Sequence, residues 1–133
     1  MPQSGVVFAI LFDLIFSLFL CEGQVYPPSG QSMTVLPGST ARIKWTFKGD
    51  PSRAILGWYF TKRGDSISKE EEIAFKFRTR NLVISNSSLP GVAIELPATV
   101  VLKNVDKRYN GKYRFHAVVA NGGGMSIVVV VVA

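Results

Sequence analysis

The stretch from Leu102 to Phe115 constrains the fold of this chain more than any other part of its sequence. Leu102 and Val105 come first, and Gly111, Tyr113 and Phe115 then follow at every second position. A spacing of two places side chains on the same face of a β-strand. The glycine suits a tight corner before that strand. The alternation therefore predicts a strand with Tyr113 and Phe115 on the face toward the core.

A second alternating stretch lies upstream, where Ala41, Ile43 and Trp45 occupy every second position. Trp58 follows Trp45 by 13 residues, and Phe115 follows Trp45 by 70 residues. Apolar residues alternating with polar ones are typical of a strand with one buried face. Both tryptophans are therefore candidate core residues.

These residues resemble the immunoglobulin superfamily, nearest its variable (V-set) type. Domains of that family usually read Leu-x-x-Val and then Gly-x-Tyr-x-Cys, and the cysteine pairs with one on an earlier strand that precedes a buried Trp. Here Trp45 and Phe115 stand at the two cysteine positions, and Trp58 stands at the place of the buried Trp. The resemblance implies an all-β, immunoglobulin-like antiparallel β-sandwich with Trp and Phe in place of the core disulfide. Cysteine-poor domains of this style are a feature of some invertebrate cell-surface recognition proteins.

One position departs from the family's pattern. Variable-type domains usually carry an Asp two residues before the corner glycine, paired with an Arg elsewhere, but here that residue is Tyr109. We therefore expect Asn110 and Gly111 to hold the corner alone. The expected core consists of Ile43, Trp45, Leu56, Trp58, Phe60, Leu102, Val105, Tyr113, Phe115 and Ala117.

Turn residues divide the chain into short strands, and no stretch has sustained helical periodicity. The segment 70–78 is expected to place Phe75 and Phe77 on one face and Lys76 and Arg78 on the opposite, outward face. Residues 122–124, all glycine, are expected to form the last turn. The expected strands are 32–36, 40–47, 54–61, 70–78, 81–85, 92–96, 99–105, 112–120 and 125–132. The segments 70–78 and 81–85 favour the variable type over the seven-stranded constant type.

Residues 1–23 have the pattern of a secretory signal peptide. Residues 6–20 are almost wholly apolar, and small residues near Gly23 suit cleavage after it. The absence of Lys and Arg before the apolar run and the interruption at Asp13 leave an uncleaved anchor or a misassigned start as alternatives. The expected organisation is a leader over 1–23 and one variable-type domain over 24–133. Cleavage would remove Cys21, the single cysteine, so no disulfide is expected.

The charge is strongly basic, with 15 Lys and Arg against 9 Asp and Glu. Two of the acids, Asp13 and Glu22, fall in the leader, so residues 24–133 carry a formal charge of +8. Such a surface favours anionic partners: glycans, acidic proteins or phospholipid headgroups. Nucleic acid is not an expected partner, because the basic residues are scattered without an aromatic-lined groove or a known motif.

A sheet face is the main candidate for a binding surface. Its expected members are Ile55, Tyr59, Lys76, Arg78, Arg114, His116 and Val118, joined by one row of the last strand, either Val128 and Val130 or Val129 and Val131. Aromatic, aliphatic and Arg side chains together have the composition of protein interfaces. The resemblance implies a pairing surface here, for a second copy or another receptor. A bland sheet face, or one covered by a missing neighbouring domain, is the alternative.

Two short motifs bear on an extracellular role. Asn86 begins an Asn-Ser-Ser acceptor for N-glycosylation, which is meaningful in a secreted chain. Arg63, Gly64 and Asp65 match the tripeptide of integrin ligands. Gly-Asp is also an ordinary turn pair, so a plain turn is the favoured interpretation of this tripeptide.

No pattern indicates catalysis, a metal or a cofactor. His116 is the single histidine and lacks a partner pattern with a nucleophile and an acid. Glu70, Glu71 and Glu72 are consecutive, so on a strand they point to alternate faces and do not converge on one ion. We expect no enzyme activity, no metal site and no cofactor.

The function that these observations favour is extracellular protein–protein recognition or cell adhesion without chemistry. The alternative is a secreted cationic effector that binds anionic glycans or microbial surfaces. Membrane attachment is expected only if the chain is a fragment of a longer receptor.

Overall fold

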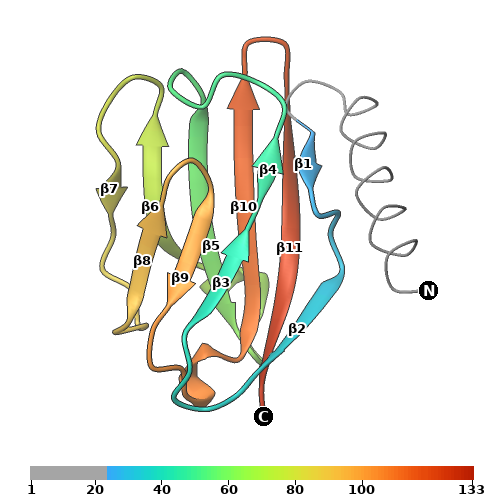
Figure 1. Ribbon diagram of the computed structural model, residues 1–133, viewed down its shortest axis with the longest axis vertical. Coiled ribbons are helices and arrows are strands. Elements are labelled where there is room, and N and C mark those ends of the chain that lie inside the picture. Colours follow the sequence, from blue (N-terminus) through green and yellow to red (C-terminus); the bar gives the residue numbers. More distant parts are fainter. Residues whose placement is uncertain (1–23) are drawn as a thin grey trace, which may run out of the picture.

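Strand pairing arranges residues 24–133, the part of the chain that the structure describes, into two packed layers (Figure 1). In this computed structural model two short 3₁₀ turns, η1 (Ile67–Lys69) and η2 (Lys107–Tyr109), interrupt an otherwise all-β chain. The strands are β1 (Val25–Tyr26), β2 (Gln31–Val35), β3 (Ala41–Lys44), β4 (Thr46–Phe47), β5 (Ile55–Lys62), β6 (Glu71–Phe77), β7 (Val83–Ile84), β8 (Val92–Glu95), β9 (Thr99–Leu102), β10 (Gly111–Val119) and β11 (Gly122–Val132).

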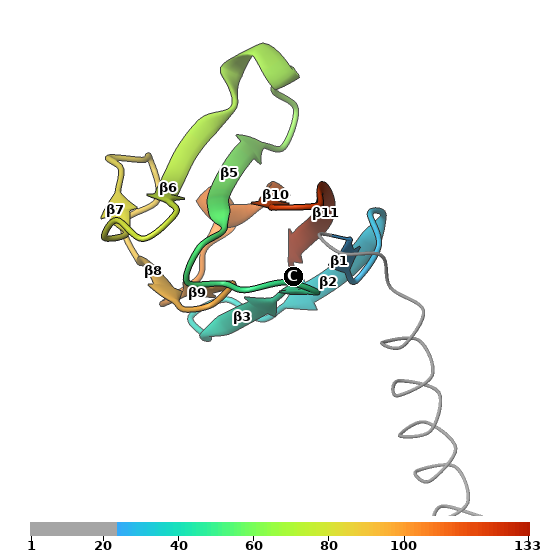
Figure 2. The ribbon, with the colours of Figure 1, turned by 90° about the horizontal axis from the view of Figure 1, so that it is seen from above.

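The larger layer is a six-stranded sheet in the order β2-β11-β10-β5-β6-β7, and the smaller is a three-stranded sheet in the order β3-β9-β8. β1 pairs only with β4. Neighbouring strands are antiparallel except for β2, which runs parallel to β11. Figure 2, which views the fold from above, shows β8, β9 and β3 facing the sheet that contains β5, β10 and β11. The expected all-β sandwich is confirmed.

The expected strands are all present within a few residues, and the differences have local causes. Trp45 separates β3 from β4, although its N–H still donates to the Ala98 carbonyl at 3.2 Å, in the register of the pairing between β3 and β9. The glycines at 122–124 were expected to form the last turn, and that prediction is wrong. They begin β11, opposite residues 117–119. The turn consists of Ala120 and Asn121, the two-residue loop that antiparallel hairpins favour.

A β-bulge in β6 overturns one expectation about its faces. Trp58 pairs with Ala74 and Tyr59 pairs with Glu72, so Ile73 between them has no partner. One extra residue reverses the direction of every side chain beyond it. Lys76, 8% exposed, therefore points inward beside Leu56, and its predicted place on the outward face is wrong.

The core confirms the aromatic substitution for the disulfide. The Trp45 and Phe115 rings stack with centroids 5.4 Å apart and planes 20° from parallel. Trp58 also lies 5.4 Å from Phe115, at 46°. All ten expected core residues are buried. The three rings thus join the strands of both sheets where a disulfide would otherwise cross, and dispersion and apolar burial replace the covalent link.

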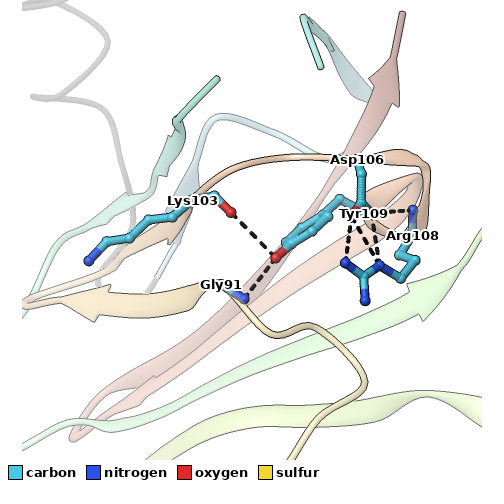
Figure 3. A network of polar contacts seen from close by, with 5 residues as sticks. All are labelled: Gly91, Lys103, Asp106, Arg108 and Tyr109. Atoms are coloured by element: carbon cyan, nitrogen blue, oxygen red, sulfur yellow. Dashed lines mark hydrogen bonds and ion pairs between the residues drawn. The ribbon is translucent and has the colours of Figure 1, made fainter. Parts of the chain in front are cut away.

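The corner before β10 is held by more than Asn110 and Gly111, which corrects the sequence expectation (Figure 3). Tyr109 is 1% exposed, and its hydroxyl accepts from the Gly91 N–H at 2.7 Å and donates to the Lys103 carbonyl at 3.4 Å. The Tyr113 hydroxyl donates to the Tyr109 carbonyl at 2.8 Å. Tyr109 therefore ties this corner to the ends of β8 and β9 in the opposite sheet.

Two further contacts complete the corner. Asp106 caps η2 by accepting from the backbone N–H of Arg108 at 2.9 Å and pairs with its guanidinium at 2.6 Å. The Asn110 side-chain oxygen accepts from the N–H of Val132 at 2.6 Å. At Gly111, with φ +156°, an added Cβ would collide with the Thr61 carbonyl oxygen, so no other residue fits.

Phe115→Ala should lower the free energy of unfolding by about 3–5 kcal/mol, because it opens a cavity among the three stacked rings. Urea denaturation followed by tryptophan fluorescence measures this change. Phe77→Ala is the matched control: Phe77 is 42% exposed, so the same truncation should cost about 1 kcal/mol or less. Equal losses in the two variants would show that the ring stack is not the centre of the core.

Tyr109→Phe should lower the free energy of unfolding by about 1–3 kcal/mol, because the Gly91 N–H loses its acceptor inside the fold. Tyr59→Phe removes a hydroxyl at the surface and should change stability by less than about 0.5 kcal/mol. The same urea titration compares the two. A neutral Tyr109→Phe would mean that the Asn110 and Gly111 turn suffices after all.

A candidate recognition surface on the six-stranded sheet

The solvent-facing side of the six-stranded sheet, here called the outward face, consists of three rows of side chains in register across β6, β5, β10 and β11. The rows follow from the strand pairing and from alternation along each strand. They are Phe77–Ile55–Val118–Gly123, Phe75–Gly57–His116–Met125, and Glu72–Tyr59–Arg114–Ile127. Val129 and Val131 continue this face along β11.

Five of the seven residues expected in the surface lie on the outward face and are half-buried: Ile55, Tyr59, Arg114, His116 and Val118. Lys76 points inward, as described above. Arg78 follows the end of β6 and is exposed, in a left-handed backbone conformation with φ +53°. The row that β11 adds is Val129 and Val131, whereas Val128 and Val130 are buried.

The sequence did not place Phe75 and Phe77 on this face. Their alternation with Ile73 indicated the core, and only the unpaired Ile73 reverses them. Met125 and Ile127 lie in the expected last strand, but they were missed because the outward row of that strand was left open and only its valines were named. Together these four residues make the outward face more apolar than the sequence suggested.

An ordered ion pair lies near the centre of the outward face. The Arg114 guanidinium donates to both carboxylate oxygens of Glu70, at 2.7 and 3.0 Å. The side chains of Arg114 and Glu70 are only 23% and 16% exposed. The guanidinium also lies 4.2 Å from the centroid of the Tyr59 ring, a cation–π contact. The hydrogen bonds to Glu70 raise the pKa of Arg114, and burial raises the pKa of Tyr59.

Tyr59 and His116 show how closely this face is packed. A Cβ on Gly57 would lie 2.5 Å from the Tyr59 hydroxyl, so the Tyr59 ring covers the space that Gly57 leaves open. Burial first, and the nearby Arg114 second, lower the pKa of His116. The lowered pKa favours the neutral form of His116 in the middle row of the face.

The other sequence motifs occupy separate places. Asn86 is exposed in the loop after β7. Arg63, Gly64 and Asp65 form an exposed turn, closed by the Asp65 N–H donating to the Lys62 carbonyl at 3.0 Å.

The three consecutive glutamates engage different partners. Glu70 binds Arg114, the carboxylate of Glu71 accepts from Ser88 at 2.6 Å, and that of Glu72 accepts from Ser85 at 3.1 Å. Among residues 24–133 no group of three or more His, Cys, Asp or Glu side chains is placed to hold a metal ion. In the same part of the chain, no helix has the length and apolar character needed to cross a membrane.

Comparison with known proteins supports the fold. No protein-family model and no curated protein matches the chain. Among solved structures it is similar to a chain from work on the structural basis for Dscam isoform specificity, with a TM-score of 0.58 and 16% sequence identity. The similarity covers 82% of this chain and 24% of the Dscam chain. This likeness shows an immunoglobulin-like fold.

Glu70→Gln should lower the free energy of unfolding by about 1–2 kcal/mol, between the values typical of exposed and of buried ion pairs. The loss arises because Arg114 keeps its charge at a site with little solvent. Glu95→Gln is the control, since the pair between Glu95 and Arg42 is 55% and 59% exposed and should contribute less than about 0.5 kcal/mol. Urea titrations at neutral pH compare the two variants, and equal effects would contradict the special role of the central pair.

Proposed function

We propose that this protein is an extracellular, non-catalytic recognition or adhesion protein, and that its outward face binds a protein partner. The observation that carries this proposal is the three-row face itself. Aliphatic and aromatic side chains from four strands are half-buried there around one ordered Arg. Side chains of this kind are enriched in protein interfaces, and a continuous apolar face is rarely left in water without a partner.

The arrangement of strands supports a variable-type domain. β6 and β7 extend the sheet that contains β5, β10 and β11, which is where variable-type domains carry their additional strands. Immunoglobulin-like sandwiches of this type often serve recognition, and the similar Dscam chain belongs to work on isoform specificity. We assign the partner to one of two kinds, a second copy of this chain or another surface receptor.

The extracellular location rests on two features of the sequence. The proposed leader, residues 1–23, lies outside the described residues. Asn86 is exposed, so a glycan could be attached there without disturbing the sandwich. A glycan at Asn86 would stand beside β7 at the rim of the outward face and would leave β5, β10 and β11 accessible.

Tyr59→Ala and Val118→Asp should each weaken binding about tenfold or more, because they remove the cation–π platform or place a charge in the apolar row. The chain is secreted from a eukaryotic cell line and examined by sedimentation velocity over a concentration series at low and high salt. Binding of fluorescently labelled tetramers of this chain to intact cells tests whether the partner is a different receptor. Leu36→Asp, at a residue 70% exposed and outside this face, is the control and should change neither readout.

The salt dependence separates this function from the alternative. Self-association or cell binding that survives high salt and is lost in the two face variants supports the proposal. Binding that disappears with salt and ignores both variants would instead indicate a cationic effector acting through the +8 charge of residues 24–133.

A further inference from the structure

A hollow at one end of the outward face has features of a binding site for an acidic side chain. Its volume is about 660 Å³, and it is lined by Asp50, Arg53, Ile55, Arg78, Val118, Val119 and Ala120. Ile55 and Val118 belong to the first row of the outward face. Gly123 lies opposite Val118 in the same row and has no side chain, so nothing on β11 covers Val118 beside the hollow.

Arg78 is held at this hollow at a conformational cost. Its φ of +53° is a left-handed conformation that a residue with a long side chain seldom adopts. Its N–H donates to the Ala54 carbonyl at 3.1 Å, and its own carbonyl accepts from the Lys76 ammonium. The guanidinium lies 5.6 Å from the centroid of the Phe77 ring. The backbone of Arg78 is thus hydrogen-bonded on both sides, while in the described residues no carboxylate accepts from its exposed guanidinium.

The surroundings of Arg78 are positively charged. Lys76 is 8% exposed, and its ammonium also donates to the carbonyls of Pro51 and Ser52, each at 3.3 Å. Backbone carbonyls satisfy its donors but do not cancel its charge. Arg53 is 82% exposed and lies 4.0 Å from Asp50, at the limit of an ion pair. One acid therefore faces three cations at this end of the sheet.

Asp50 is already engaged. One of its carboxylate oxygens accepts from the backbone N–H of Ser52 at 3.0 Å and from the Ser52 hydroxyl at 2.7 Å. These hydrogen bonds lower the pKa of Asp50 and hold it in its own loop. The Arg78 guanidinium is left with fork-shaped donors suited to a carboxylate from outside.

We propose that this hollow receives an Asp or Glu side chain of the protein partner, with Arg78 binding its carboxylate and an adjacent aliphatic residue covering Ile55 and Val118. The proposal rests on the proposed function and names the chemistry of the partner. An acidic glycan fits less well, because four of the seven lining residues are aliphatic and offer nothing to sugar hydroxyls, whereas they suit an apolar residue beside the carboxylate.

The test uses the full chain secreted from eukaryotic cells and two synthetic peptides, trifluoroacetyl-Gly-Val-Glu-Val-Gly-amide and the same peptide with Gln in place of Glu. Fluorine NMR line broadening during titration reports weak binding. We expect a dissociation constant of about 1 mM for the Glu peptide, and about tenfold weaker binding for the Gln peptide.

Arg78→Gly should weaken binding of the Glu peptide about tenfold while leaving the fold intact, because glycine adopts φ +53° without strain. Arg80→Ala is the matched control. It removes the same charge from the same loop and a similar contact with the Phe77 ring, 5.8 Å from the ring centroid, but Arg80 lines a separate hollow with Leu82, Leu96 and Pro97. It should therefore leave the affinity within about twofold. Thermal unfolding by circular dichroism checks that both variants are folded.

Three results would overturn the proposal: no saturable binding of the Glu peptide, equal losses in Arg78→Gly and Arg80→Ala, or equal affinity for the Glu and Gln peptides. A heparin-derived octasaccharide that binds more tightly than the Glu peptide and loses this affinity in Arg78→Gly would reassign the hollow to a glycan. Tyr59→Ala should not affect peptide binding. If Tyr59→Ala leaves cell binding intact while Arg78→Gly abolishes peptide binding, the proposed function of the outward face is refuted. The proposal that the hollow binds an acidic side chain is then still supported.

Discussion

The stack of Trp45, Phe115 and Trp58 is the interaction on which the rest of this structure depends. Trp45 lies between β3 and β4, while Phe115 and Trp58 are neighbours on β10 and β5. The three rings therefore connect the two sheets through the core. A disulfide stabilises mainly by restricting the unfolded chain. Buried rings stabilise the folded state instead, by removing apolar area from water. Residues 24–133 contain no cysteine, so this part of the chain folds without a disulfide.

This exchange has a cost. The indole N–H groups of both tryptophans are buried, and neither has a hydrogen-bond partner in the described part of the chain. Leaving such a donor unpaired costs about 1–3 kcal/mol. The rings must then pack closely enough to offset the loss, and centroid distances of 5.4 Å lie within the favourable range for aromatic pairs. The stack also explains why the corner at Tyr109 matters, because the corner sets where β10 begins and so where Phe115 lies.

Much of the fold could be predicted from the sequence because most strands alternate with a period of two. Ile43, Trp58 and Phe115 follow that period, and each is buried as expected. Tyr109 was harder. It stands in a polar stretch between two strands, and only the folded chain brings the Gly91 N–H to its hydroxyl from 18 residues away. A partner so distant in sequence leaves no local pattern to detect.

The candidate surface was harder to predict than the core for a different reason. One unpaired residue, Ile73, changes which side chains of β6 face the solvent. Continuous alternation would have kept Phe75 and Phe77 in the core and left Lys76 in water. The bulge brings both aromatic rings to the outward face and buries Lys76, whose ammonium then binds the Arg78 carbonyl.

The same bulge therefore links the apolar rows to the charged hollow. Because Lys76 points inward, its ammonium reaches the carbonyls of Pro51 and Ser52 in the loop after β4 and the carbonyl of Arg78. A surface with an apolar centre and a fixed cation at one end is directional: a partner that matches both has one orientation on the sheet. Arg78 adopts this conformation within the Phe77–Arg80 turn, which the Arg80 N–H closes by donating to the Phe77 carbonyl at 3.0 Å, so the turn itself sets the place of the cation at the end of the apolar rows.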